Sequence, residues 1–108
     1  MTTAAQLLEQ PFSTMPDLIR AHAKERPDHV AIVDGDRRVT FAEFDALIDR
    51  AAAALQRDGV GNHGAVAICG PSSIEYVTIY IAALRVGAAA CPLAPSSTPE
   101  QLAAMIRD

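Results

Sequence analysis

The stretch from residue 65 to residue 95, AVAICGPSSIEYVTIYIAALRVGAAACPLAP, constrains the fold more than any other part of the chain. An apolar run at 65–69 leads through a Gly-Pro-Ser-Ser turn into an almost wholly apolar segment at 74–86, and a second apolar run at 88–93 follows Gly87. Short apolar runs that do not alternate are typical of parallel strands buried on both faces. We therefore predict a parallel strand-helix-strand unit, with strands 65–69 and 88–93 buried and the helix covered by protein on most sides.

The clearest amphipathic helix is predicted at residues 40–55. Thr40 at the N-cap and Glu43 three residues later form the pattern of a capping box, in which each side chain accepts a hydrogen bond from a free backbone N–H of the first turn. The apolar residues share one face, and the charged residues, Asp45 and Asp49 among them, share the other. We expect this helix to lie on a sheet with its outer face in water.

The remaining segments predict two more helices. Residues 1–12 are a weakly patterned arm, and Ser13 or Thr14 then caps a helix that runs to about Arg26, where Pro27 stops it. A last helix begins after Ser97 or Thr98, with Pro99 in its first turn and a Thr98-to-Gln101 capping box.

A β-hairpin is predicted between the helix that ends near Arg26 and the helix at residues 40–55. Residues 30–33 and 38–40 are short strand-forming runs, and Asp34 with Gly35 is a two-residue turn signal. The predicted fold is therefore α/β, with a partial, mostly parallel sheet flanked by helices and a small hairpin.

Two loops resemble ligand-binding motifs. GVGNHG at 59–64 fits G-x-G-x-x-G, but it follows a helix and opens a strand, whereas a dinucleotide fingerprint follows a strand and opens a helix, so we interpret Gly59 as a left-handed helix cap. The turn at 70–73 follows a strand and opens a helix, which is a position where anions bind. We favour the simpler interpretation that Ser72 or Ser73 caps the helix.

Composition excludes several classes of function. Nine basic against 13 acidic residues, a net charge of −4 and the absence of Trp argue against a nucleic-acid surface. The N-terminus lacks a secretory signal pattern, and the longest apolar segment, 74–86, is far shorter than the roughly 20 residues of a membrane span. Cys69 and Cys91 do not form a CxxC pair, so we predict buried, reduced thiols and a cytoplasmic protein.

The sequence contains no recognisable catalytic arrangement. His22, His29 and His63 lie apart from cysteines or carboxylates at metal-ligand spacing, and we predict surface histidines and no metal site. No nucleophile elbow, Walker-type loop or paired carboxylate motif is present. The chain's own chemistry therefore predicts a scaffold with no catalytic residues.

The C-terminus predicts an incomplete domain. The last helix reaches Asp108 with apolar residues still at helical spacing and without a Gly or Asn cap. The predicted helices are also too few to cover both faces of a parallel sheet. The alternative belongs to another class of function: a small α/β domain that is complete, has no catalytic activity and binds a partner protein.

Three blocks, in order, resemble the N-terminal start of the adenylate-forming (AMP-binding) enzyme superfamily, which includes acyl- and aryl-CoA synthetases and peptide-synthetase adenylation domains. The blocks are RPDHVA at 26–31, VTFAEF at 39–44, and ALRVGA at 83–88 running into PLAP at 92–95. The second resembles the family's Thr-Tyr-x-Glu-Leu opening of a helix, and the third its Gly-Ala-x-x-x-Pro-Leu-x-Pro strand. GPSS at 70–73 resembles the family's Pro-Asn-Ser turn.

The resemblance implies a parent enzyme that makes an acyl-adenylate from ATP and a small carboxylic acid, with Mg, and then passes the acyl group to a thiol such as CoA. It implies that residues 13–108 are the N-terminal portion of that domain, that the catalytic groups lie in the rest of the same polypeptide, and that this portion alone is inactive. CoA ligases of the family place a basic residue that reaches the CoA nucleotide where Ser96 stands here, so the resemblance implies Ser96 as the position that contacts the cofactor. A CoA ligase acting on a fatty or aromatic acid is favoured over a peptide-synthetase adenylation domain, because the chain begins at Met1 with a short arm.

Overall fold

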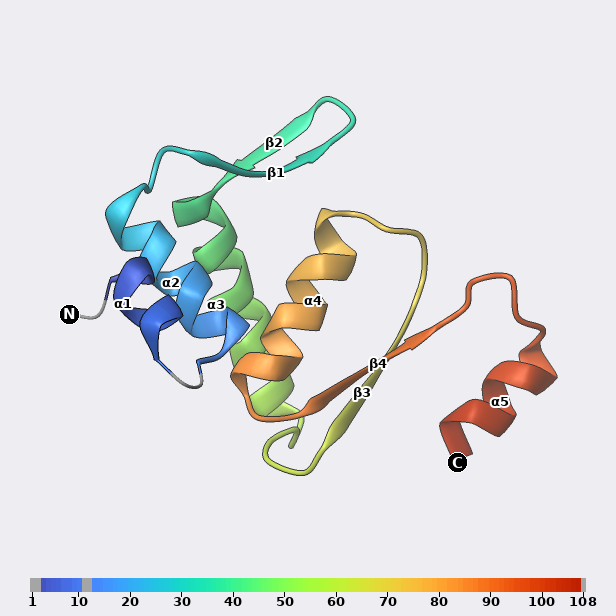
Figure 1. The fold of residues 1–108 in the computed structure, drawn as a ribbon. Helices are drawn as coiled ribbons and strands as arrows, with labels where there is room; N and C mark the ends of the chain where they lie inside the picture. The colour runs from blue at the N-terminus through green and yellow to red at the C-terminus, as the bar shows by residue number, and fades with distance from the viewer. Residues whose placement is uncertain (1–2, 11–12, 108) are drawn as a thin grey trace.

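The computed structural model describes residues 3–10 and 13–107, and Figure 1 shows how their helices and strands are arranged. In chain order these elements are α1 Ala4–Glu9, α2 Met15–Glu25, β1 Val30–Asp34, β2 Arg37–Thr40, α3 Phe41–Arg57, β3 Ala65–Cys69, α4 Ile74–Arg85, β4 Ala89–Leu93 and α5 Pro99–Arg107. The strands form an antiparallel hairpin, β1–β2, and a parallel pair, β3–β4. The predicted α/β class is confirmed.

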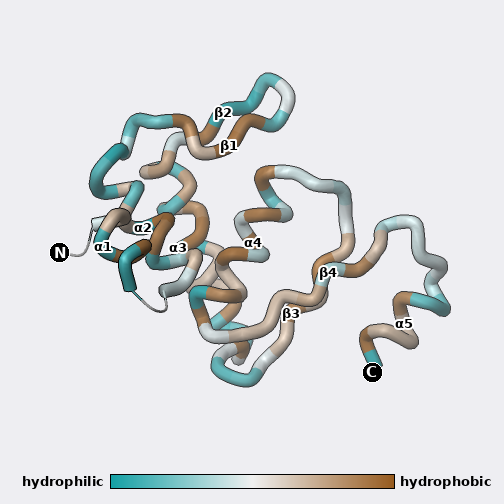
Figure 2. The backbone as a smooth tube through the Cα atoms, viewed as in Figure 1, coloured by the Kyte–Doolittle hydropathy of each residue, from teal (hydrophilic) through white to brown (hydrophobic). Residues whose placement is uncertain are grey.

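The parallel pair is the strand-helix-strand unit that the sequence predicts. β3 and β4 pair in register from Ala65 opposite Ala89 to Cys69 opposite Leu93, and α4 connects them. Figure 2 shows hydrophobic colours along α4 and most of β3 and β4.

The strands are not buried on both faces, so that prediction is wrong. Only Ile68 of β3 is buried, whereas Ala65, Ala67 and Cys69 are exposed. The physical reason is that α4 contacts one side of the pair, and no other described helix makes more than a weak contact with either strand. Both thiols are free, but the prediction of buried cysteines is wrong, because Cys69 is exposed on this open side and Cys91 is only half-buried.

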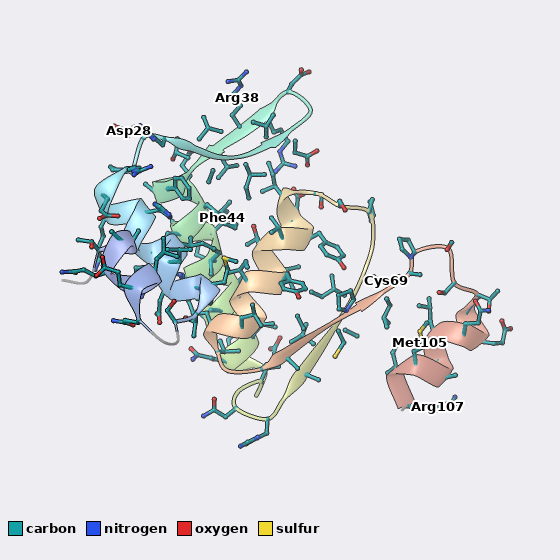
Figure 3. All side chains as sticks on the ribbon, in the orientation of Figure 1. Asp28, Arg38, Phe44, Cys69, Met105 and Arg107 are labelled. Atoms are coloured by element: carbon teal, nitrogen blue, oxygen red, sulfur yellow. The ribbon has the colours of Figure 1, made fainter. Side chains whose placement is uncertain are left out.

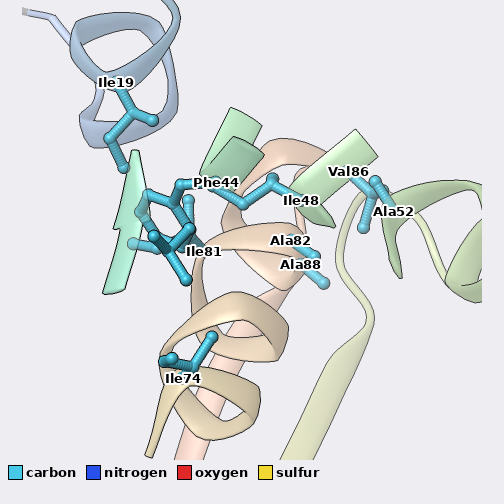
Figure 4. Packing of buried hydrophobic residues seen from close by; sticks show 10 residues of the cluster. Ile19, Phe44, Ile48, Ala52, Ile74, Ile81, Ala82, Val86 and Ala88 are labelled. Atoms are coloured by element: carbon cyan, nitrogen blue, oxygen red, sulfur yellow. The ribbon is translucent and has the colours of Figure 1, made fainter. Parts of the chain in front are cut away.

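The core lies between helices. α3 packs mainly against α4 and α2, and Figure 4 shows Phe44 and Ile48 of α3 facing Ile81 and Ala82 of α4. Ile48 and Ala82 are both 0% exposed, which shows how closely the two helices approach. The expectation that α3 lies on a sheet is corrected, because α4 stands between it and β3–β4.

The predicted helix caps are present. Thr14 caps α2, Ser73 caps α4, and Thr40 with Glu43 forms the complete capping box of α3. Thr98 and Gln101 also exchange hydrogen bonds at the start of α5. These local side-chain bonds satisfy N–H groups that a helix cannot pair internally.

Glycines end α3 and α4 in the same way. Gly59 has a φ of +89° and Gly87 a φ of +85°, which is the left-handed region where glycine carries no Cβ penalty. The N–H of Gly87 donates to the carbonyl of Leu84, and the N–H of Ala88 donates to the carbonyl of Ala83. This is a Schellman motif, and the predicted left-handed cap at Gly59 is confirmed with it.

Two local features differ from prediction. The hairpin turn is at Gly35 and Asp36, one residue later than expected, because Asp34 pairs with Arg37 as the last rung of the ladder. The N-terminal arm contains a helix that was not predicted, α1, which begins with a Thr3–Gln6 capping box. Residues 1, 2, 11 and 12 of the arm lie outside the described part of the chain.

α5 stands apart from the other elements. None of its residues is buried, and Figure 1 shows it beyond the carboxyl end of β4. Ile106 is 65% exposed and Met105 41% exposed. The apolar side chains of Met105 and Ile106 therefore lie largely in solvent, whereas Leu102 and Ala103 are half-buried.

Candidate functional site

The carboxyl ends of β3 and β4 bring together the two segments that the sequence singles out for ligand contact. Cys69 and Leu93 are paired at this edge, and the loop at 70–73 follows one while the turn at 94–97 follows the other. The Sγ atom of Cys69 lies 3.9 Å from the carbonyl oxygen of Ala94, within reach of a weak S–H hydrogen bond. Ligands of open α/β sheets gather at such an edge, so it is the candidate functional site.

The start of α4 is already occupied by protein groups. The Ser73 hydroxyl accepts a hydrogen bond from the N–H of Tyr76 at 3.1 Å, which confirms the predicted cap. The Asp34 carboxylate, from the tip of the hairpin, accepts one from the N–H of Ile74 at 3.3 Å. An acidic group thus fills the position that an anion would take at this helix terminus.

Glu75 adds a second negative charge to the same turn. Its own backbone N–H, and then the Arg37 guanidinium, hold the pKa of the Glu75 carboxyl below its usual value. The Arg37 and Glu75 side chains form an ion pair at 2.7 Å. Beside it, a shallow hollow of about 180 Å³ is lined mainly by apolar atoms, including those of Ile68, Pro71 and Ile79.

Ser96 is exposed in the turn between β4 and α5. The N–H of Ser97 donates to the carbonyl of Ala94 at 3.0 Å, which closes this turn. The structure therefore places Ser96 at the same sheet edge as the loop at 70–73. Its predicted contact with CoA stays a prediction.

The three histidines do not converge. His29 and His63 are exposed, but His22 is half-buried, and its ring centroid lies 5.0 Å from that of Phe41, so the prediction of a surface histidine is wrong for His22. The cause is that α2 packs on the first turn of α3. Within residues 3–10 and 13–107, no three His, Cys, Asp or Glu side chains gather at metal-binding distance.

An ionic network that sequence reasoning missed joins α2, α3 and α4. Arg85 lies 2.9 Å from Asp45 and 3.0 Å from Asp49, and its guanidinium also donates to the carbonyl of Pro16 at 2.9 Å. Arg20 approaches both carboxylates from α2. The Arg85 and Asp45 side chains are only 13% and 19% exposed, so the expected water-facing side of α3 is partly a helix-helix contact.

The motif residues found in the sequence are explained by these contacts. The carbonyls of Pro27 and His29 accept hydrogen bonds from the N–H groups of Ala42 and Phe41, so the block at 26–31 anchors the start of α3. In the third block, Arg85 makes the ionic network and Gly87 turns the chain into β4. Figure 3 shows the side chains in place, with Cys69 at the sheet and Arg38 on the hairpin.

A model of the AMP-binding enzyme family matches residues 19–108. The chain belongs to this family. Among curated relatives of this AMP-binding chain, a linear gramicidin synthase polypeptide of Brevibacillus parabrevis is 35% identical over 92 residues, which is 85% of this chain. A probable CoA ligase of Humulus lupulus is 34% identical over 96 residues, or 88% of the chain. The resemblance found in the sequence is confirmed.

Solved structures of adenylate-forming enzymes share the fold. The inhibitor-bound N-terminal domain of FACL13 from Mycobacterium tuberculosis superposes with a TM-score of 0.83 and 26% identity, over 88% of this chain and 24% of that one. The NpsA N-terminal subdomain from Klebsiella oxytoca gives a TM-score of 0.81 at 24% identity, over 89% of this chain and 25% of that one. At that identity the second match shows the fold alone.

The AMP-binding chain is much shorter than these relatives. It spans 2% of the gramicidin synthase polypeptide and 18% of the Humulus CoA ligase. Separately, none of the helices in the described residues is both long enough and apolar enough to cross a membrane.

Proposed function

We propose that this chain is the N-terminal structural part of a longer ATP-dependent acyl- or aryl-CoA ligase. The observation that carries the proposal is the family match over residues 19–108. A fatty acyl CoA synthetase of Mycobacterium tuberculosis supports the CoA-ligase branch, with a TM-score of 0.80 and 27% identity over 84% of this chain. In this proposal residues 13–108 begin the catalytic domain and residues 1–12 precede it.

The proposed reaction has two steps. A small carboxylic acid attacks the α-phosphorus of ATP, held with Mg, and pyrophosphate leaves. The thiol of CoA then attacks the acyl carbon of the adenylate, and AMP leaves. We assign the groups that perform these steps to the rest of the same polypeptide, and to this chain the layer on which they are built.

The contacts of the motif residues support this structural role. Glu43 completes the capping box of α3. Arg85 joins α2, α3 and α4, and Gly87 ends α4. The open side of β3 and β4, which presents Ala65, Ala67 and other small residues, is a suitable surface for a further layer of the same polypeptide.

A peptide-synthetase adenylation domain is the second candidate. It is favoured by the relatives from linear gramicidin synthase, at 35% identity, and from a dimodular nonribosomal peptide synthase of Bacillus subtilis, at 32% over 98 residues. The two candidates share adenylate formation and differ in the thiol that receives the acyl group.

The identity of the thiol acceptor tests the proposal. The longer enzyme is supplied with ATP, Mg and a panel of fatty, aromatic and amino acids, and AMP release is measured with CoA, with a phosphopantetheinylated carrier protein, or with neither. Turnover that requires CoA supports the ligase. Turnover that requires the carrier protein supports the synthetase domain and contradicts the leading proposal.

A further inference from the structure

The β1–β2 hairpin is fixed firmly at its base. The N–H groups of Phe41 and Ala42 donate to the carbonyls of His29 at 2.9 Å and Pro27 at 3.2 Å. Val39, near the end of β2, is buried in the main core at 8% exposure. This end of the hairpin therefore moves only with α3.

The tip of the hairpin is held differently, by two electrostatic contacts to the first turn of α4. The Asp34 carboxylate accepts the hydrogen bond from Ile74, and Arg37 pairs with Glu75. The Arg37 and Glu75 side chains are 56% and 61% exposed, so water and salt reach the ion pair. Exposed pairs of this kind contribute little to stability.

Hollows rather than packed side chains flank these contacts. One, of about 280 Å³, separates Ile32 and Val33 of β1 from Val77 of α4. The other, of about 260 Å³, lies between Arg37 of the hairpin and apolar side chains of α3 and α4, including Leu47. Ile32 packs against the main core, but Val33, which is closer to the tip, is 59% exposed, so apolar burial attaches the tip less than it attaches the base.

The hairpin also has a place to bend. The ladder register shifts between Val30, which pairs with Thr40, and Ile32, which pairs with Val39, so β1 has an irregularity at the base of the hairpin. Bulges of this kind bend a strand locally. Figure 1 shows the hairpin extending from the start of α3 toward the first turn of α4.

We propose that the β1–β2 hairpin is a strap that closes on the N-terminus of α4 and opens at its tip while its base stays fixed. In the closed state, Asp34 and Arg37 hold the first turn of α4 and, through Ser73, the loop at the carboxyl end of β3. In the open state the N–H of Ile74 is released and both hollows, which solvent already reaches, become wider. The strap therefore sets the position of the candidate functional edge.

Amide hydrogen exchange of the chain, followed by NMR, tests the strap. Arg37→Gln removes the ion pair, and the amide of Ile74 should then exchange about two- to fivefold faster, the factor expected for an exposed ion pair. Arg37→Lys should retain most of the protection. The matched control is Arg38→Gln, since Figure 3 shows Arg38 pointing away from α4.

The amide of Ala82, in the middle of α4 and 0% exposed, reports global unfolding. A strap predicts that Arg37→Gln leaves exchange at Ala82 unchanged. It also predicts that raising salt from about 0.05 to about 0.5 M speeds exchange at Ile74 in the wild type but hardly in Arg37→Gln. An unchanged Ile74 rate in Arg37→Gln, or equal acceleration at Ile74 and Ala82, overturns the proposal.

Discussion

Replacing Gly87 with alanine perturbs the junction of α4 and β4 in two separable ways. The φ of +85° at Gly87 lies in the left-handed region, where a residue with a Cβ loses about 1–2 kcal/mol. A Cβ there would also overlap the Oδ1 atom of Asn62, so the Asn62 side chain must leave its rotamer, at a cost of about 1 kcal/mol. We expect Gly87→Ala to lower the free energy of unfolding by about 2–3 kcal/mol.

Two other glycines provide matched controls for Gly87. Gly59 has a φ of +89° but nothing within 4 Å of its added Cβ, so Gly59→Ala should cost only the backbone part, about 1–2 kcal/mol. Gly70 is not left-handed and is also open, so Gly70→Ala should be neutral or stabilising by less than about 1 kcal/mol. In an Asn62→Ala background, Gly87→Ala should cost the same as Gly59→Ala.

Urea unfolding, followed by circular dichroism at 222 nm, measures these differences. With an m-value of about 1.5 kcal/mol/M, Gly87→Ala should lower the midpoint by about 1–2 M. Equal costs for Gly87→Ala and Gly59→Ala, whether or not Asn62 is present, would refute the steric argument. A Gly87→Ala variant as stable as Gly70→Ala would refute the left-handed assignment itself.

The ionic network, the capping box and the turn at Ser96 each give a further prediction. Arg85→Met leaves the mostly buried Asp45 carboxylate with only Arg20, at 3.6 Å, as an ionic partner and should destabilise the chain by about 2 kcal/mol in the same urea assay. Arg50→Met on the exposed side of α3 should change stability by less than about 0.5 kcal/mol. Hydrogen bonds from the backbone and side chain of Thr40 lower the pKa of Glu43 from 4.5, so its contribution to stability is present above pH 4.5 and is lost as the pH falls through the lowered pKa. Unfolding free energy measured against pH should fall less steeply there in Glu43→Gln, and an unchanged slope contradicts this assignment. In the proposed enzyme, Ser96→Arg should lower KM for CoA and leave ATP–pyrophosphate exchange unchanged, and an unchanged KM argues against a CoA contact at this turn.

Features set by neighbouring residues could be predicted from the sequence. The Thr40–Glu43 box, the Ser73 cap and the glycine ends of α3 and α4 depend on residues within one or two turns of each other. The strand-helix-strand unit has the same origin, because its apolar runs and punctuation are local. These signals act over short distances and therefore survive in the sequence pattern.

Features set by distant residues could not be predicted. The helical pattern assigns Asp45 to a solvent-facing side of α3, but the fold brings Arg85, 40 residues away, against it. Asp34 and Ile74 are also 40 residues apart, and no sequence pattern links a turn aspartate to that helix. The burial of Cys69 depends on what covers the outer side of β3, which is decided outside the strand.

Carboxylate-dependent ATP–pyrophosphate exchange tests most directly the claim that this chain supports, but does not perform, adenylate formation. The account predicts exchange by the proposed longer enzyme with at least one fatty or aromatic acid, and none by the 108-residue chain alone. Exchange catalysed by the chain alone would contradict its structural role. A longer enzyme that shows no exchange with any acid of the panel would contradict the proposed activity.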